Sequence, residues 1–148
     1  MSRGLEGWDG NFLDLASHVS KWSKDPSTKV GAVIVRPDNS VASLGYNGFP
    51  RRVDDAEARL ADRPTRLLMT VHAEVNAILS SYERLQGCTL YVSPFFPCAN
   101  CAAAVIQAGI VRVVTWLGVA KEAEARWVEH AYVARLMFAE AGVEITEY

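Results

Sequence analysis

Two short motifs combine residue types that can bind a metal ion and move a proton. His72-Ala73-Glu74 is followed downstream by Pro97-Cys98-Ala99-Asn100-Cys101. An imidazole and two thiolates are good ligands for Zn²⁺, and three protein ligands leave one tetrahedral position open, as in catalytic zinc sites. The Glu74 carboxylate can take a proton from a water molecule activated by the metal. We therefore predict one catalytic zinc per chain, held by His72, Cys98 and Cys101, with Glu74 as the general acid and base.

The elements around these motifs support the prediction. A helix is expected over residues 98–108, directly after Pro97, so both thiols fall in its first turn, where the helix dipole favours thiolate. A second helix is expected over residues 73–80. A C-x-x-C motif alone could instead be a redox pair or half of a structural zinc knuckle, and an H-x-E motif alone occurs by chance. The order of the two motifs favours catalytic zinc. We interpret Cys88 as a buried apolar residue, and His18 and His130 as structural or surface residues.

Composition restricts the kind of protein. A chain of 148 residues with 50% hydrophobic content is expected to form a single domain over residues 1–148. The cysteine count of 3 is odd, and two of the three are assigned to the metal, so a disulfide framework is excluded and a reducing cytoplasm is favoured. We expect no membrane span. The formal net charge of -2 argues against a nucleic-acid partner, which would require an excess of lysine and arginine.

Hydrophobic periodicity predicts an α/β fold. Helical spacing runs over residues 8–22, and two strands, 30–35 and 41–46, form a hairpin. A polar connection over residues 47–66 contains a short predicted helix near residues 56–61. Helices and strands then alternate, with strands expected at residues 89–93, 111–116 and 143–146 and a long helix at about 123–141. This alternation predicts a largely parallel sheet covered on both faces, with ligands bound at the carboxyl ends of its strands.

These motifs and several longer stretches resemble the deoxycytidylate deaminases of the zinc-dependent cytidine deaminase superfamily, for which H-x-E and P-C-x-x-C are the signature. The matching stretches are residues 23–35, 45–50, 71–78, 87–92, 97–101 and 106–110. The resemblance implies a three-layer α/β/α cytidine deaminase-like fold with a central mixed five-stranded sheet. It also implies hydrolysis of dCMP to dUMP and ammonia, which supplies dUMP for dTTP synthesis, with Glu74 carrying the proton to N3 and then to the departing amine.

The resemblance also suggests substrate-binding residues. Thr28 and Asn47 match positions that hold the sugar, the backbone of Ala73 would touch the base, and Phe96 and Pro97 would lie beside it. The alternative is that Thr28 only caps a turn and Asn47 only permits one. For Asn47 we favour the sugar role, because glycines on either side already supply the flexibility of the turn.

The stretch from Gly45 to Gly48 is similar to the effector site of regulated family members, which dCTP activates and dTTP inhibits, with Mg²⁺. Such regulation accompanies a homo-oligomer, with a hexamer favoured. Candidate residues for contacts to phosphate or effector are Lys24, Gly45, Tyr46, Gly48, Arg51 and Arg52.

Three departures from the family pattern leave other substrates open. Residues 93–97 form a segment one residue longer than usual, residues 116–120 lack the usual charged run with a tyrosine, and the ligands of a second zinc are missing. The alternatives are a deaminase of a 5-substituted dCMP such as 5-methyl-dCMP, of a nucleoside or free base, or of tRNA adenosine, although no basic face favours tRNA. A catalytically silent nucleotide-binding subunit is a further alternative, but it would not need Glu74.

Overall fold

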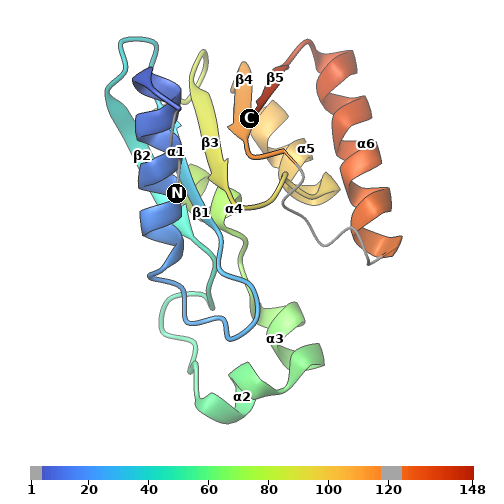
Figure 1. Ribbon diagram of the computed structural model, residues 1–148. Coiled ribbons are helices and arrows are strands. Elements are labelled where there is room, and N and C mark those ends of the chain that lie inside the picture. Colours follow the sequence, from blue (N-terminus) through green and yellow to red (C-terminus); the bar gives the residue numbers. More distant parts are fainter. Residues whose placement is uncertain (1–4, 118–124) are drawn as a thin grey trace.

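The computed structural model describes residues 5–117 and 125–148, and within them five strands form one sheet (Figure 1). The strands are β1 (Gly31–Val35), β2 (Val41–Tyr46), β3 (Thr89–Ser93), β4 (Arg112–Thr115) and β5 (Glu144–Glu147), in the order β2-β1-β3-β4-β5. β1 is antiparallel to both β2 and β3, whereas β3, β4 and β5 are parallel. The sheet is therefore mixed, as the family resemblance implied. The largely parallel sheet expected from alternation alone holds for the pairs β3-β4 and β4-β5, whereas β1 lies between β2 and β3 and is antiparallel to both.

The helices are α1 (Gly7–Ser20), α2 (Glu57–Ala61), α3 (Arg63–Met69), α4 (Ala73–Leu79), α5 (Ala99–Gln107) and α6 (Ala125–Ala141). All but α3 were predicted, with ends shifted by a few residues. The sequence did contain a signal for α3, since Asp62 caps the helix by accepting a hydrogen bond from the Thr65 N–H and Pro64 follows in the first turn. No helix in the described ranges has the length and apolar character to span a bilayer.

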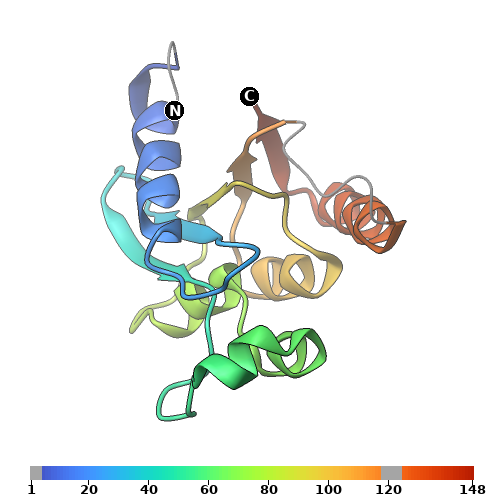
Figure 2. The ribbon, with the colours of Figure 1, turned by 60° about the horizontal axis from the view of Figure 1, so that its bottom comes forward.

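The sheet lies between two helical layers (Figures 1 and 2). Alternate residues of β1 point to opposite faces: Val33 and Val35 pack in the cluster that contains α1, whereas Ala32 and Ile34 pack with residues of α4, α5 and α6. This two-sided burial explains why β1 is apolar throughout. The α/β/α layering implied by the resemblance is confirmed. Helices α2 and α3 lie together beyond the layers, at the bottom of Figure 1.

A glycine allows α4 to lie directly on β2. A Cβ atom at Gly45 would be 2.5 Å from the backbone nitrogen of Ala77 and 2.9 Å from the carbonyl oxygen of Ala73. Ser43, also on β2, donates a hydrogen bond of 2.6 Å to the carbonyl oxygen of Ala77. These two contacts fix the position of α4, whose first turn carries Glu74.

Asp9 links α1 to the sheet and to the last residue. Its carboxylate accepts two hydrogen bonds from Arg112, at 2.9 and 2.7 Å, and further bonds from the hydroxyls of Tyr91 and Tyr148, at 2.7 and 2.6 Å. The Arg112 guanidinium is the main reason that the pKa of Asp9 falls to about 2. Because this pKa lies below the unfolded value of about 3.9, the ionised carboxylate stabilises the fold at neutral pH.

We expect Asp9→Asn to lower the free energy of unfolding by about 2 kcal/mol at pH 7, because the variant loses the stabilisation linked to the depressed pKa. That stabilisation is present above about pH 4 and is lost as the pH falls toward 2, so the two proteins should converge in acid. Urea unfolding at pH 7, 5 and 3 measures the difference. Asp14→Asn, an exposed position on the same helix, is the control and should change little. A difference that stays constant with pH would contradict the assignment.

Candidate active site

Two helix starts carry the metal-binding motifs. His72 is the residue before the first turn of α4, and Cys98 holds the same position in α5. The Cys98 sulfur accepts a hydrogen bond of 3.4 Å from the Cys101 N–H, which places both sulfurs at this helix start. The positive ends of the two helix dipoles lie beside the three side chains, which favours negative charge on the sulfur atoms there.

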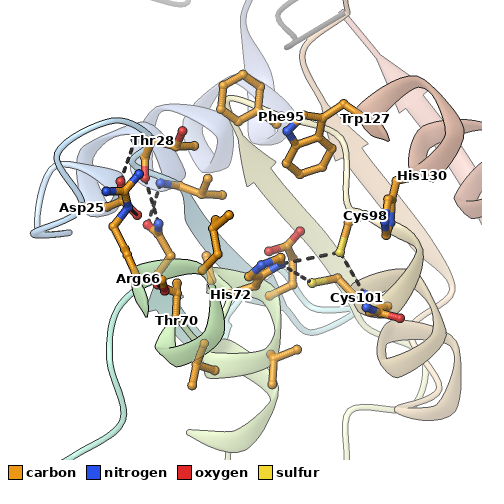
Figure 3. Close-up of a pocket in the computed structure, with 18 of the residues that line it drawn as sticks. Asp25, Thr28, Arg66, Thr70, His72, Phe95, Cys98, Cys101, Trp127 and His130 are labelled. Carbon is orange, nitrogen blue, oxygen red and sulfur yellow. Dashed lines mark hydrogen bonds and ion pairs between the residues drawn. The ribbon is translucent and has the colours of Figure 1, made fainter. Parts of the chain in front are cut away.

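The three candidate ligands converge (Figure 3). The Nδ1 atom of His72 lies 3.2 Å from the sulfur of Cys101 and 3.5 Å from that of Cys98, and all three ligand atoms lie within 4.8 Å of one another. Tetrahedral Zn²⁺ with ordinary bond lengths separates its nitrogen and sulfur ligands by about 3.6 Å. The site therefore fits zinc. Within the described ranges it is the one such group, and Cys88 is buried away from it.

The two thiols influence each other's proton. The hydrogen bond with Cys101 is the largest cause that lowers the pKa of the Cys98 thiol, to about 4, and interaction with His72 lowers it further. The same hydrogen bond, together with burial, raises the pKa of Cys101. Without a metal the pair thus shares one proton. A divalent cation replaces that proton and stabilises both thiolates.

Glu74 is buried beside these ligands and lines the same cavity. Its side chain is removed from water, and this desolvation is the main reason that its pKa rises to about 7. A neighbouring Zn²⁺ would act in the opposite direction and favour the ionised carboxylate, the form that accepts a proton from water.

The cavity has a volume of about 520 Å³, which is in the range of small-molecule sites. Four of the predicted substrate-binding residues line it: Thr28, Asn47, Ala73 and Phe96. Pro97 is buried and is not part of the described lining.

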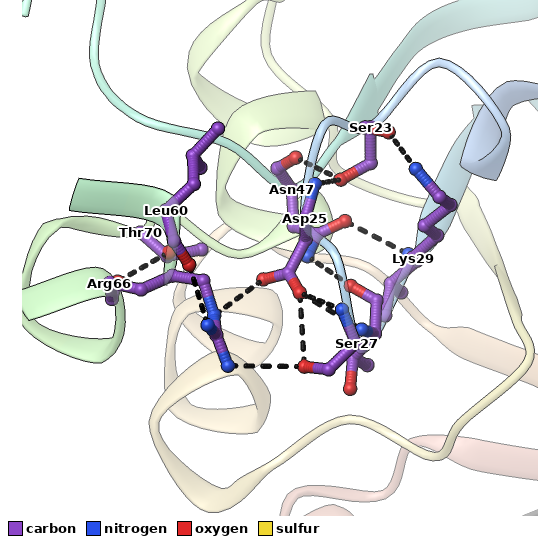
Figure 4. A network of polar contacts seen from close by, with 10 residues as sticks. Ser23, Asp25, Ser27, Lys29, Asn47, Leu60, Arg66 and Thr70 are labelled. Carbon is purple, nitrogen blue, oxygen red and sulfur yellow. Dashed lines mark hydrogen bonds and ion pairs between the residues drawn. The ribbon is translucent and has the colours of Figure 1, made fainter. Parts of the chain in front are cut away.

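Asn47 organises the loop between α1 and β1 (Figure 4). Its side-chain amide donates a hydrogen bond of 2.8 Å to the carbonyl oxygen of Thr28, and its Oδ1 atom accepts one of 2.9 Å from the Val30 N–H. Asn47 therefore supports the backbone while it lines the cavity. Its amide retains a second N–H that is available to a ligand, so the sugar role remains compatible with this support.

The residues predicted to contact phosphate or effector lie outside this cavity. Lys24, Tyr46 and Gly48 line a second, smaller cavity of about 150 Å³, where the Lys24 ammonium is 2.8 Å from the Asp55 carboxylate. Gly45 faces α4. Arg51 and Arg52 are exposed in a turn and belong to neither described lining. The sequence reasoning thus did not identify the basic residues of the main cavity.

The basic residues that line the main cavity are Arg63 and Arg66, which lie on the unpredicted helix α3. His130, interpreted from the sequence as a structural or surface residue, makes a structural contact at the site: its Nδ1 atom accepts a hydrogen bond of 3.1 Å from the Ala99 N–H at the start of α5, and its side chain also lines the cavity. Trp127, one turn earlier on α6, also lines the cavity. Its ring stacks with that of Phe95, with the two ring centroids 6.4 Å apart. The sequence signal for these two residues was their separation of three positions, which places Trp127 and His130 on the same side of the predicted helix. In the unusual segment after β4, residues 118–120 lie outside the described residues.

Four similarities to known proteins accompany this geometry. Residues 6–117 match the family model for the cytidine and deoxycytidylate deaminase zinc-binding region. The chain is 45% identical to an uncharacterized deaminase in the luxG 3' region of Aliivibrio fischeri, over 96% of this chain and 94% of the relative. It is 35% identical to Homo sapiens deoxycytidylate deaminase, over 95% and 79% of the two chains. The structure of a dCMP deaminase from the cyanophage S-TIM5 in complex with dCMP and dUMP aligns with a TM-score of 0.70 and 25% identity, over 93% and 94%.

We expect the purified protein to contain one zinc ion per chain, because the described residues form one ligand group of the required geometry. Cys98→Ala and Cys101→Ala should lose the metal, since each removes one of three ligands. Cys88→Ala is the matched control and should retain it. Elemental analysis measures the ratio of metal to protein. Two zinc ions per chain, or retention of zinc by both ligand variants, would contradict the site.

Proposed function

The chain belongs to the cytidine and deoxycytidylate deaminase zinc-binding family, and we propose that it hydrolyses dCMP to dUMP and ammonia in the cytoplasm. The observation that carries the proposal is the buried Glu74 beside the converging side chains of His72, Cys98 and Cys101, in a cavity of nucleotide size. The names of the human and cyanophage relatives support dCMP as the substrate.

Different residues of the chain would bind the metal and transfer the protons of this reaction. His72, Cys98 and Cys101 would hold Zn²⁺, which when bound lowers the pKa of water toward neutrality. Glu74 accepts a proton from the water that attacks C4 of cytosine and transfers it to N3. A second transfer through Glu74 goes to the exocyclic amine, the bond from C4 to this nitrogen breaks, and ammonia leaves. Water thus supplies the oxygen and the protons, and no redox partner is required.

Other residues would bind and shield the nucleotide. The backbone of Ala73, at the start of α4, borders the base, and Thr28 and Asn47 are available to the sugar. The rings of Phe95 and Trp127 stack above the site (Figure 3), where they can exclude bulk water from the base. Phe95 belongs to residues 93–97, the segment that is one residue longer than in the family pattern. This segment would determine whether a cytosine with a substituent at C5 fits the site.

Among dCMP, 5-methyl-dCMP, CMP, dCTP, deoxycytidine and guanine, we expect dCMP to have the highest kcat/KM for release of ammonia. Glu74→Gln should retain zinc but lose about 10²- to 10⁴-fold in kcat, because the amide cannot exchange the proton. Glu140→Gln, an exposed position on α6, is the control for the loss of a carboxylate.

Each of the other possible results would support one of the alternative functions. A higher kcat/KM for 5-methyl-dCMP would identify a deaminase of modified nucleotides, and one for deoxycytidine or guanine would identify a nucleoside or base deaminase. Absence of ammonia release from the zinc-loaded protein with every compound would indicate a silent subunit. Normal turnover by zinc-loaded Glu74→Gln would overturn the proton-transfer role.

Regulation by dCTP and dTTP with Mg²⁺, in a homo-oligomer and most simply a hexamer, forms a second part of the proposal. Its support is that Lys24, Tyr46 and Gly48 share one small cavity next to the substrate loop. A cavity of about 150 Å³ is smaller than typical ligand sites, so binding of a triphosphate requires the site to extend, as it would beside a neighbouring subunit.

We expect dCTP with Mg²⁺ to raise the activity, dTTP to lower it, and the dependence on substrate to be sigmoidal, because each effector must bind the two states of an oligomer with different affinity. Initial rates across dCMP concentrations, with light scattering for the mass of the oligomer, provide the measurement. Hyperbolic curves that saturating dCTP and dTTP leave unchanged, or a monomer under assay conditions, would exclude this regulation.

A further inference from the structure

The ring of Phe96, which lines the active-site cavity, is contacted by two residues of α6. The guanidinium carbon of Arg135 lies over the face of the ring, 4.2 Å from its centroid. Phe138, which is fully buried, meets the ring edge to face, with the two ring centroids 5.9 Å apart and the ring planes at 79°. Arg135 and Phe138 are three residues apart and therefore lie on the same side of the helix. The orientation of Phe96 thus depends on a helix that carries none of the candidate zinc ligands.

Arg135 is itself oriented by Glu147, on β5. The two terminal nitrogens of the guanidinium donate hydrogen bonds of 2.7 Å each to the two carboxylate oxygens of Glu147. Two parallel hydrogen bonds fix the plane of the guanidinium as well as its position. Glu147 is anchored in turn, because β5 pairs with β4 and the Glu147 side chain is only 16% exposed. The sheet therefore sets the position of the cation, and the cation sets that of the Phe96 ring.

The ion pair of Arg135 with Glu147 differs from an ordinary surface pair. The Arg135 side chain is 42% exposed, and pairs at such positions usually add little to the stability of a protein. Arg36 and Glu83 form a comparable pair, in which the guanidinium also donates to both carboxylate oxygens, but neither residue lines a described cavity. Arg135 in addition lies over an aromatic ring, which attracts a cation electrostatically. This contact indicates a role at the cavity.

Two further residues of α6 contact the same segment before α5. Trp127 stacks with Phe95, and His130 accepts a hydrogen bond from the Ala99 N–H. The contacts from α6 therefore reach both sides of the first cysteine ligand. Arg135 differs from these two residues in one respect: Trp127 and His130 line the cavity, whereas Arg135 is not part of the described lining. It can therefore be replaced without removal of a group that a ligand would touch.

We infer that Arg135, oriented by Glu147, is a positioning residue that holds the Phe96 ring in the orientation that receives the base of the substrate. The inference rests on the proposed function, because it assumes that a cytosine binds beside Phe96. A ring that is released adopts other orientations as well, and the apparent affinity then falls with the fraction of molecules that can bind. Once the substrate is bound, the ring is in place and the groups of the reaction are unchanged. The loss of Arg135 therefore affects KM and not kcat.

The test measures KM and kcat with dCMP, or with whichever compound of the substrate panel the wild type prefers. Arg135→Gln should raise KM about 3- to 10-fold, the range expected for a lost cation–π contact, and change kcat by less than about 2-fold. Glu147→Gln should raise KM less, because the cation remains but its plane is no longer fixed. Arg135→Lys should recover part of the affinity, since it restores the cation without the planar geometry. Arg36→Gln removes the comparable pair outside both cavities and, as the matched control, should leave both constants unchanged.

A double-mutant cycle separates positioning through Phe96 from a general structural role. Phe96→Leu removes the ring and keeps an apolar side chain. In this background Arg135→Gln should change KM by less than about 2-fold, because the ring on which Arg135 acts is gone. Every variant should retain its zinc, and the melting temperature of Arg135→Gln should stay within about 4 °C of wild type. An equal increase of KM in both backgrounds, or loss of zinc in Arg135→Gln, would overturn the inference.

Titration calorimetry of dUMP into the zinc-loaded protein supplies a readout that does not require turnover. Binding should weaken about 3- to 10-fold in Arg135→Gln and stay unchanged in Arg36→Gln. Unchanged KM and unchanged dUMP binding in Arg135→Gln, or a fall in kcat alone, would overturn the positioning role and leave the proposed function intact. Preference of the wild type for another compound would instead overturn the proposed function. The same variants, tested with that compound and its deaminated product, would still decide the role of Arg135.

Discussion

The meeting of two helix N-termini is the constraint on which this molecule depends. The first turns of α4 and α5 bring His72, Cys98, Cys101 and the buried Glu74 to one point, so the positive ends of two helix dipoles face each other. Thiolates and a carboxylate balance those ends, but several buried negative charges then repel one another. A divalent cation resolves this conflict, since two thiolates and one Zn²⁺ together are neutral. The requirement for metal thus follows from the backbone as well as from the ligand set.

The sheet holds the two helix starts in place. Helix α4 precedes β3 in the chain and packs on β1 and β2, whereas α5 follows β3 and packs on α4 and α6. The close approach at Gly45 fixes the depth of α4, and the contact of His130 with the Ala99 N–H occupies one backbone group at the start of α5. A substitution at Gly45, which is not a ligand, would therefore displace α4 and change the geometry of the candidate metal site.

The sequence predicted the parts of the site that depend on neighbours in the chain. The spacing of His72 with Glu74 and of Cys98 with Cys101 is local, and the strands follow from runs of apolar residues. The direction of β1, the role of His130 and the basic wall of α3 depend instead on how distant segments pack. Arginine at position 66 resembles a solvent-exposed residue of a polar segment in the sequence, yet Asp25 and the Leu60 carbonyl hold it in a buried position. Only the tertiary structure brings these partners together.

The cavity is assembled from stretches of chain with separate tasks. The starts of α4 and α5 carry the groups that would perform the chemistry, whereas α3, the loop before β1 and the start of α6 supply the walls that a ligand meets first. The wall formed by α3 is a separate seven-residue helix that carries none of the candidate zinc ligands and does not carry Glu74. A substitution on the cavity side of α3 would therefore alter the walls that a ligand meets while the residues at the starts of α4 and α5 stay the same.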